Sequence, residues 1–288
     1  MAHNPDTQYA GSACAILTSW VAALLSISYL CALLFITFPW IDLTVAARFT
    51  APGGTRFPLA ADVFLRFLNE LVPVLAGLMA LFILIGLPVA WRRKRPFLGL
   101  GMRRLWFLAL SFGLGPGLIA NTLLKDHWGR ARPRDITQFG GTLDFSPAIL
   151  ISDQCANNCS FISGDASLAF AFLALALILP GQRALNVGAA LLFGMLIGTA
   201  RIVQGAHFLS DVIFAGLFMA LLVLMLHMVL IDRCFSLHPQ KGWENLKLFS
   251  KRRRKTGLHK TPVAFKRMVW LFFRATPDDL HVDQPAST

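Results

Sequence analysis

The chain has 288 residues, of which 56% are hydrophobic and only 15% are charged, and its net charge is +12. A water-soluble domain of this length carries a larger charged fraction, so the composition indicates a membrane protein. The basic residues gather in a few clusters beside apolar segments, which suits anionic headgroups and phosphates. No folded domain is left outside the apolar segments to read DNA or RNA, so we expect no nucleic-acid partner.

Six segments are apolar over lengths close to the roughly 20 residues that a helix needs to cross the hydrocarbon core. They are residues 15–38, 71–91, 105–124, 165–180, 186–203 and 208–231. The first is too long for a signal peptide and lacks a basic leader, so we interpret it as a retained span. The fourth is short and depends partly on the motifs below. We predict an all-α polytopic membrane protein with six transmembrane helices in a bundle.

The basic clusters predict the orientation of the spans, because Lys and Arg favour cytoplasmic loops. Residues 92–95 lie between the second and third segments, and residues 251–255 follow the sixth. Both clusters fall on the same side as the two termini, so we expect that side to be cytoplasmic. The loop 125–164 then faces outward although it is basic, an exception that anion binding would explain.

We expect the chain to divide into a membrane domain, residues 1–235, and a cytoplasmic basic tail, residues 236–288. Within the tail, residues 263–274 alternate apolar and basic side chains, as an amphipathic helix on the cytoplasmic leaflet would. A disordered tail is the alternative, and it is favoured for the last dozen residues or so.

Three polar clusters lie at the predicted outer ends of spans, where charged side chains are costly and usually functional. The first runs from Lys125 to Pro133. Lys125 and Arg132 could converge on one anion, the lysine as a point charge and the arginine as a bidentate fork. Taken alone, such a run is more often an interface anchor.

The second cluster, Ser160-Phe161-Ile162-Ser163-Gly164-Asp165-Ala166, precedes the fourth span. Ser163 and Gly164 would offer a hydroxyl and free backbone N–H groups to a phosphate at the start of a helix. An ordinary N-cap made by Ser163 or Asp165 is the alternative, and the two interpretations are compatible.

The third cluster runs from Arg201 to Asp211, between the fifth and sixth segments. His207 and Asp211 are four residues apart, so on a helix they share a face and Asp211 can hold the imidazole in one tautomer. An imidazole so oriented, with its other nitrogen free, is a nucleophile. A lone histidine at an interface would more often be structural.

Together the clusters resemble the motifs of the phosphatidic acid phosphatase type 2 superfamily of membrane phosphatases. That pattern is Lys, six residues, Arg-Pro; then Pro-Ser-Gly-His; then Ser-Arg, five residues, His, three residues, Asp. Lys125 and Arg132-Pro133 match the first part, and Arg201, His207 and Asp211 match the third. The resemblance implies that His207 forms a phosphohistidine and that Asp211 orients it. It also implies a set of residues that hold the phosphoryl oxygens: Lys125, Arg132, Ser163, Gly164 and Arg201.

Two positions depart from the family pattern. The Ser-Arg pair reads Ala200-Arg201, and Asp165 stands where the family has its general-acid histidine. An ionised Asp165 would repel the phosphate and could not donate a proton, whereas a buried, protonated Asp165 could act as the acid. Alternatively the leaving group needs little help, as in a phosphoanhydride or a sugar anomeric phosphate.

The resemblance implies a metal-independent phosphatase without a cofactor, acting on a phosphorylated lipid from within the bilayer. Clustered cations take the role of magnesium, and no group of outer carboxylates could hold a metal. Lipid A is the favoured substrate, with phosphatidylglycerol phosphate, undecaprenyl pyrophosphate and phosphatidate as alternatives. We expect a multi-pass protein of the bacterial inner membrane whose active site faces the periplasm. The oligomeric state is not predicted.

Two other functions fit the same motifs. A lipid phosphotransferase would pass the phosphoryl group from His207 to a second lipid instead of water. A non-catalytic protein could bind anionic lipid through the same cations, although binding needs neither a free imidazole nitrogen nor its orienting carboxylate. In the outer loop, Cys155 and Cys159 are equally consistent with a disulfide and with two free thiols.

Overall fold

The computed structural model describes residues 5–232 and Cys234, and residues 5–232 contain helices but no β-strand. This confirms the predicted all-α class. The elements in chain order are α1 (Pro5–Thr37), α2 (Trp40–Ala47), η1 (Pro58–Ala61), α3 (Val63–Arg93), α4 (Met102–Phe112), the π-helix η2 (Gly113–Leu124), α5 (Lys125–His127), η3 (Pro133–Asp135), η4 (Thr137–Phe139), α6 (Gly164–Phe170), α7 (Leu173–Ile178), α8 (Arg183–Val203) and α9 (Leu209–Leu230). The predicted tail, residues 236–288, lies outside the described residues.

Five helical stretches of the described residues are long and apolar enough to cross a membrane. They are Cys14–Thr37, Val63–Arg93, Met102–His127, Arg183–Val203 and Leu209–Leu230. Six spans are therefore not confirmed. The fourth predicted segment forms α6 and α7, a shorter apolar stretch at Gly164–Ile178 that is interrupted at Ala171 and Phe172.

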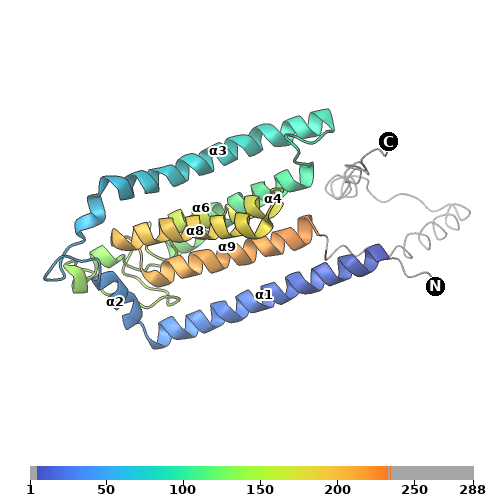
Figure 1. Cartoon of the computed structure of the whole chain (residues 1–288). Helices are drawn as coiled ribbons and strands as arrows, with labels where there is room; N and C mark the ends of the chain where they lie inside the picture. Colours follow the sequence, from blue (N-terminus) through green and yellow to red (C-terminus); the bar gives the residue numbers. More distant parts are fainter. Residues whose placement is uncertain (1–4, 233, 235–288) are drawn as a thin grey trace, which may run out of the picture. The chain divides into compact units, whose positions relative to one another are not determined.

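The α6–α7 stretch is surrounded by protein and not by lipid. Figure 1 shows α6 in the middle of the bundle, and it packs against α3, α8, α9 and η2. Its alanines are buried, and two glycines of α8 leave room for large side chains: Gly194 faces the ring of Phe170, and Gly198 faces Val212 of α9. Small residues of this kind let helices approach closely inside a membrane.

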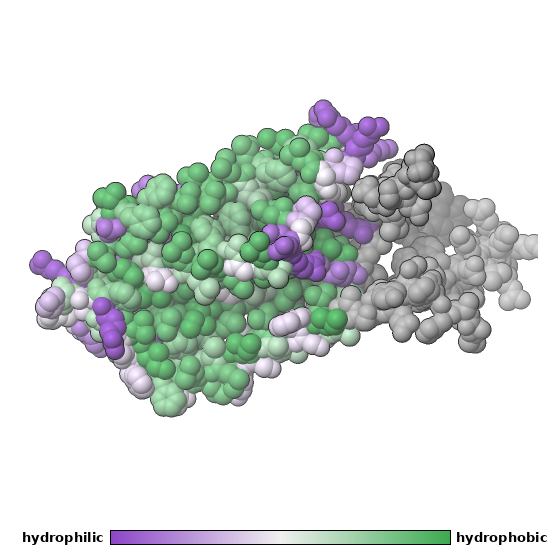
Figure 2. Space-filling model, in the orientation of Figure 1, coloured by the Kyte–Doolittle hydropathy of each residue, from purple (hydrophilic) through white to green (hydrophobic). Residues whose placement is uncertain are grey.

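The outer surface of the long helices is apolar. Leu84, Trp91 and Leu192 expose 63–73% of their surface, and Figure 2 shows an apolar band between hydrophilic residues gathered at the two ends of the molecule. A continuous apolar surface of this size is not stable in water. This surface therefore contacts the hydrocarbon core, and the protein is a multi-pass membrane protein.

One end of the bundle carries α2, η1, η3, η4 and the loop that precedes α6, and we call it the site end. In Figure 1 it lies opposite the N-terminal end of α1. Several aromatic rings cover it, with Phe57 packed edge-to-face against Phe139 and Phe145 against Phe208. This packing fixes the connections between helices at the site end.

Two disulfides are present among the described residues. Cys155 and Cys159 are joined in the loop before α6, and Cys14 of α1 is joined to Cys234 after α9. The second pair was not expected from the sequence because its members are 220 residues apart. The packing of α1 along α9 brings them together. Cys31 is the free cysteine of the described chain.

Candidate active site

The three polar clusters meet at the site end. The first follows η2 at Lys125, the second opens α6, and the third occupies the turn between α8 and α9. Contacts join them: His207 is bonded to Ser160, Asp165 lies against Arg201, and Gly164 lies against Lys125. The fold therefore brings together residues that are distant in sequence, in the combination that the motifs predicted.

His207 lies in the turn before α9, and not on the helix as the spacing suggested. The turn is possible because Gly205 adopts a φ of +65°, with the ring of Phe57 packed where a side chain would otherwise stand. Phe208 is extended and caps α9, which begins at Leu209. The backbone carbonyl of Gly205 also accepts a hydrogen bond of 3.1 Å from the N–H of Arg134.

The imidazole of His207 is fully buried, and its two nitrogens have different environments. Nδ1 lies 2.8 Å from the carbonyl oxygen of Ser160. Because a carbonyl can only accept, Nδ1 carries the proton and Nε2 carries the lone pair. Nε2 has no hydrogen-bond partner among the described residues. This is the tautomer that a nucleophilic histidine requires.

Burial lowers the pKa of His207, and Arg201 and Arg132 lower it further, while Asp211 raises it. Desolvation disfavours the charged imidazolium, as does a neighbouring guanidinium. The balance keeps the imidazole neutral at neutral pH. The nitrogen that faces away from Ser160 is then available to attack an electrophile.

Asp211 does not hold His207 through a direct hydrogen bond. Its Oδ2 lies 3.8 Å from Nδ1 of His207, which is beyond hydrogen-bond range. The same oxygen accepts a hydrogen bond of 2.6 Å from the hydroxyl of Ser160 and one of 2.8 Å from the N–H of Phe208. The carboxylate therefore contacts the imidazole through Ser160: the hydroxyl of Ser160 donates to Asp211, and its carbonyl accepts a hydrogen bond from Nδ1 of His207.

Arg130 is fully buried behind this relay, and the sequence did not single it out from the neighbouring arginines. Its Nη1 donates to Asp211 Oδ1 at 2.6 Å, and its Nη2 donates to Asp42 Oδ2 at 2.8 Å. The guanidinium also stacks on the ring of Phe208, with 4.3 Å between Cζ and the ring centroid. Arg130 thus compensates two buried carboxylates, as buried charges require.

Asp42 brings α2 into the site, which nothing in its local sequence indicated. Besides Arg130, it accepts the backbone N–H of Ser210 at 2.9 Å and the hydroxyl of the same serine. Burial raises the pKa of Asp42, and the guanidinium of Arg130 opposes that shift. The chain of contacts runs from Asp42 through Arg130, Asp211 and Ser160 to His207.

Lys125 follows the π-helix η2, an uncommon helix type that is often found at functional sites. A side chain at Gly164 would clash with Asn121 and would lie 3.1 Å from the ammonium nitrogen of Lys125. At Gly164 the backbone of α6 therefore lies directly against the side chain of Lys125. Asn121, which the sequence did not indicate, completes this contact.

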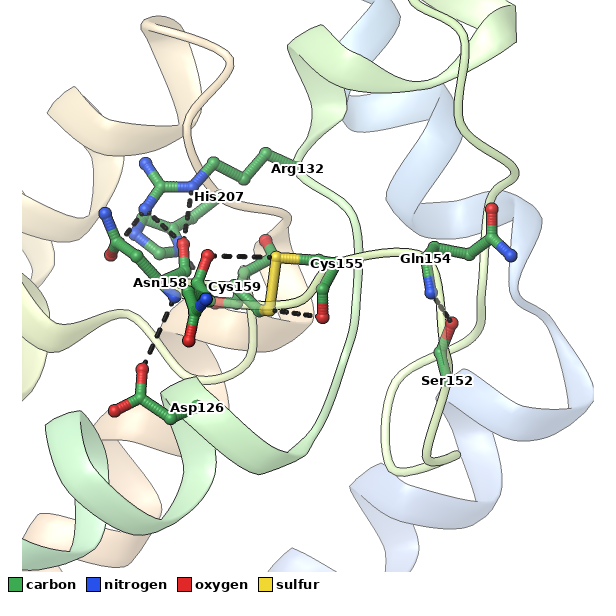
Figure 3. The surroundings of a disulfide bond; sticks show 10 residues. Asp126, Arg132, Ser152, Gln154, Cys155, Asn158, Cys159 and His207 are labelled. Atoms are coloured by element: carbon green, nitrogen blue, oxygen red, sulfur yellow. Dashed lines mark hydrogen bonds between the residues drawn. A yellow bond between two sulfur atoms is a disulfide. The ribbon is translucent and has the colours of Figure 1, made fainter.

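Arg132 is 8% exposed and is held by one residue, Asn158. Nη2 donates to the carbonyl and the side-chain Oδ1 of Asn158 at 2.7 and 2.8 Å, and Nε donates to the same carbonyl at 3.2 Å (Figure 3). Nη1 makes no hydrogen bond with the described residues, so its two protons can bind an anion. Burial lowers the pKa of Arg132, but a guanidinium remains charged at any physiological pH.

Asp165 is paired with Arg201: the two side chains approach to 3.0 Å as an ion pair. Arg201 also donates to Gln204 Oε1 at 3.0 Å, an oxygen shared with Asn69. The Asp165 side chain is 29% exposed, so the buried environment considered for an acid at this position is not present. The Asp165 carboxylate, which stands where the family pattern has a histidine, is thus compensated by the guanidinium of Arg201.

Ser163 is fully buried and caps α6: its hydroxyl accepts the N–H of Ala166 at 3.4 Å. Its carbonyl accepts the hydroxyl of Ser167 at 2.8 Å. The N-cap interpretation therefore describes the contacts of this serine. Within the described residues, no three His, Cys, Asp or Glu side chains gather as a metal site would need.

Comparison with known proteins gives the class that this site and fold define. The profile of the PAP2 superfamily matches residues 104–235. The lipid A 4'-phosphatase of Francisella tularensis subsp. novicida (strain U112) is 35% identical over 189 residues, which cover 64% of this chain and 83% of the relative. The chain belongs to the PAP2 superfamily, as the motifs predicted, and is a membrane phosphatase.

Further similarities cover smaller regions or are weaker. The lipid A 4'-phosphatase of Rhizobium leguminosarum is 41% identical over 105 residues, 36% of this chain and 45% of the relative. The crystal structure of a transmembrane PAP2-type phosphatidylglycerolphosphate phosphatase from Bacillus subtilis aligns with a TM-score of 0.42 and 21% identity, covering 72% of this chain and 93% of that one.

Proposed function

We propose that the chain hydrolyses a phosphate monoester of lipid A, through a phosphohistidine on His207, at the periplasmic face of the bacterial inner membrane. The observation that carries the proposal is the buried His207, whose Nδ1 is occupied by Ser160 and whose Nε2 is free. The relatives named lipid A 4'-phosphatases support lipid A as the substrate. The motifs that carry the proposal all lie in the membrane domain, residues 1–235.

The proposed reaction has two in-line steps. Nε2 of His207 attacks phosphorus, and a P–N bond forms as the P–O bond to the lipid breaks. The proton on Nδ1 stays with the imidazolium, which Ser160 and the charge of Asp211 stabilise. Water then attacks the phosphohistidine, releases inorganic phosphate and restores the neutral imidazole. The departing sugar oxygen gains a proton from water, because Asp165 is ion-paired with Arg201.

Three cations surround the proposed position of the phosphoryl group: Lys125, Arg132 and Arg201. In phosphoryl transfer the protein contributes mainly by positioning and by stabilising charge on the equatorial oxygens. Burial strengthens these interactions, because Arg132 is 8% exposed and the Arg201 side chain 18% exposed. Cations of the chain thus take the role of a divalent metal, and we expect activity without one.

The two phosphates of lipid A differ as leaving groups. The two relatives reported above are lipid A 4'-phosphatases, which favours the 4'-phosphate. The aspartate at position 165 favours the anomeric 1-phosphate, whose departing oxygen is less basic and needs less help from an acid. We propose the 4'-phosphate, because the Francisella similarity covers 83% of that relative. Release of the 1-phosphate is the alternative outcome.

The proposed topology has six spans, with α6–α7 as a short central span enclosed by protein. Basic residues at the end of α3, Arg92 and Arg93, lie at the end opposite the site and would face the cytoplasm. The site end would then face the periplasm, an oxidising compartment in which the Cys155–Cys159 disulfide would persist.

The test is phosphate release by detergent-purified protein with EDTA present, from lipid A and from phosphatidylglycerol phosphate, undecaprenyl pyrophosphate and phosphatidate. We expect release from lipid A by the wild type and none by His207→Ala. His127→Ala is the matched control, because His127 is exposed at the same end of the bundle. Full activity of His207→Ala would overturn the histidine mechanism. Inhibition by EDTA would overturn the metal independence, and faster release from another lipid would overturn lipid A as the substrate.

A non-catalytic lipid-binding protein is the alternative that one observation favours, since Asp165 replaces the family acid and neutralises Arg201. A binding protein would retain lipid A without releasing phosphate. A phosphotransferase would release phosphate only slowly and would instead label a second lipid when the substrate phosphate is radioactive. The same assay therefore separates the three functions.

A further inference from the structure

The loop closed by the Cys155–Cys159 disulfide and the next residue, Ser160, together contact residues of the first and third clusters. Asn158 accepts hydrogen bonds from the guanidinium of Arg132, and the N–H of Cys159 donates to the carbonyl of Lys125 at 3.0 Å. The carbonyl of Ser160 accepts a hydrogen bond from Nδ1 of His207. These are three consecutive residues. The loop therefore connects the proposed nucleophile to two of the proposed phosphate-binding cations.

Asn158 adopts a backbone conformation that few residue types favour. Its φ is +53°, in the left-handed region that Gly and Asn adopt most readily. In this conformation its backbone carbonyl and its side-chain Oδ1 both point at the guanidinium of Arg132, as Figure 3 shows. Its N–H lies 3.4 Å from Asp126 Oδ1.

The disulfide holds this conformation in an otherwise exposed segment. Residues 156–158 are exposed, whereas Cys159 is fully buried and anchors one end of the ring. The sulfurs close the ring across only three intervening residues. Without the bond, the exposed residues would gain conformational freedom, and the carbonyl and amide of Asn158 would no longer be fixed opposite Arg132.

We propose that Asn158, fixed by the Cys155–Cys159 disulfide, is a positioning residue that aims Arg132 at the phosphoryl group, so that reduction of this disulfide weakens phosphate binding. The inference rests on the proposed function and deepens it. A long, flexible arginine loses rotamer freedom when it binds an anion. Asn158 holds Nε and Nη2 in advance, and Nη1 has no partner within residues 5–232. A group held in its binding position in this way is preorganised.

The first experiment measures equilibrium binding of radiolabelled inorganic phosphate to the purified full chain, a readout independent of hydrolysis. Asn158→Gly is the main variant, because glycine keeps the positive φ and the backbone carbonyl and removes the side chain that carries Oδ1. We expect its phosphate dissociation constant to rise about threefold to tenfold, the size of effect that the loss of one typical hydrogen bond has. An unchanged constant, with Arg132→Ala weakened, would overturn the role of Asn158.

A double-mutant cycle separates positioning from a general structural role. In the Arg132→Ala background, Asn158→Gly should weaken phosphate binding no further, because its effect acts through Arg132. Additive effects of the two substitutions would show that Asn158 acts elsewhere and would overturn the proposal.

Reduction tests the disulfide, and the second disulfide supplies the matched control. Reductant should weaken phosphate binding by the wild type and by Cys14→Ser/Cys234→Ser, and reoxidation should restore it. The variant Cys155→Ser/Cys159→Ser should already bind weakly and should not respond. Equal binding by reduced and oxidised wild type would overturn the redox part.

The outcome is distinguishable from failure of the proposed function. If phosphate binding depends on Asn158 but no lipid is hydrolysed, the catalytic function fails and the positioning role stands. If lipid A is hydrolysed through His207 while binding and KM are indifferent to Asn158 and to reductant, only the positioning role fails.

Discussion

At the scale of single residues, the environment of His207 leads to a pH dependence. Burial places its pKa below the ordinary value of 6.5, and the nucleophile must be unprotonated. Activity should therefore persist at mildly acidic pH and fall only as pH decreases through the lowered pKa. Because Asp211 raises that pKa, Asp211→Asn should move the acid limb of kcat/KM to still lower pH, besides reducing the rate.

The measurement is kcat/KM against pH for the wild type and Asp211→Asn on one lipid. The substrate phosphate also titrates near pH 6, but its contribution is common to both proteins, so the difference between the profiles reports the enzyme. His127→Ala should follow the wild type. An acid limb that moves upward in Asp211→Asn would contradict the assignment of the titrating group to His207.

The residues that we propose to carry chemistry could be selected from the sequence, because short spacings group them. Lys125 and Arg132 share one motif, and His207 and Asp211 are near neighbours in the chain. Their partners could not be predicted in the same way. Ser160 contacts His207 across 47 residues of sequence, and no periodicity or composition marks such a pair. The expected direct bond between Asp211 and His207 is for this reason a relay through Ser160.

At the scale of elements, Arg130 connects the short helix α2 to the start of α9. Two buried carboxylates, Asp42 and Asp211, depend on this guanidinium for compensation. Arg130→Met should destabilise the protein by about 3–5 kcal/mol, because removing one partner leaves buried charge unpaired. Asp42→Asn should destabilise it less, since the amide oxygen still accepts hydrogen bonds from Arg130 and Ser210.

Thermal unfolding in detergent, followed by circular dichroism, gives the order of stability. Arg134→Met is the matched control, because Arg134 is 47% exposed and lies 3.9 Å from Asp135 in a surface ion pair, which contributes about 0–1 kcal/mol. If Arg130→Met and Arg134→Met unfolded at the same temperature, the buried network would not be what joins α2 to the bundle.

The long helices could be predicted from hydropathy, since each is apolar over the length that a bilayer requires. The α6–α7 stretch could not be placed as easily. Its apolar residues are consistent with lipid contact, but Ala166, Ala169 and Ala174 are buried against other helices. Hydropathy does not distinguish a side chain facing lipid from one facing protein, so the sequence does not decide whether this segment spans the membrane.

At the scale of the whole molecule, the two cysteine pairs lie at opposite ends of the bundle. Their redox states in the cell would therefore report its orientation in the membrane. Cys155–Cys159 is beside the site, and Cys14–Cys234 joins the N-terminal part of α1 to the end of α9. In the proposed topology the first pair faces the periplasm and the second the cytoplasm. Because disulfides persist in the periplasm and are reduced in the cytoplasm, the pairs should differ in redox state in the cell.

We expect a membrane-impermeant thiol reagent, added to intact spheroplasts, to label Cys155 and Cys159 only after a mild impermeant reductant. Cys14 and Cys234 should be protected until the membrane is permeabilised, and should then react without reductant. Two variants in a Cys31→Ser background, each retaining one pair, assign the labels. Labelling of Cys14 from outside would show that the orientation is the opposite one, with the active site in the cytoplasm. The Cys155–Cys159 disulfide would then be reduced in the cell and would not hold Asn158.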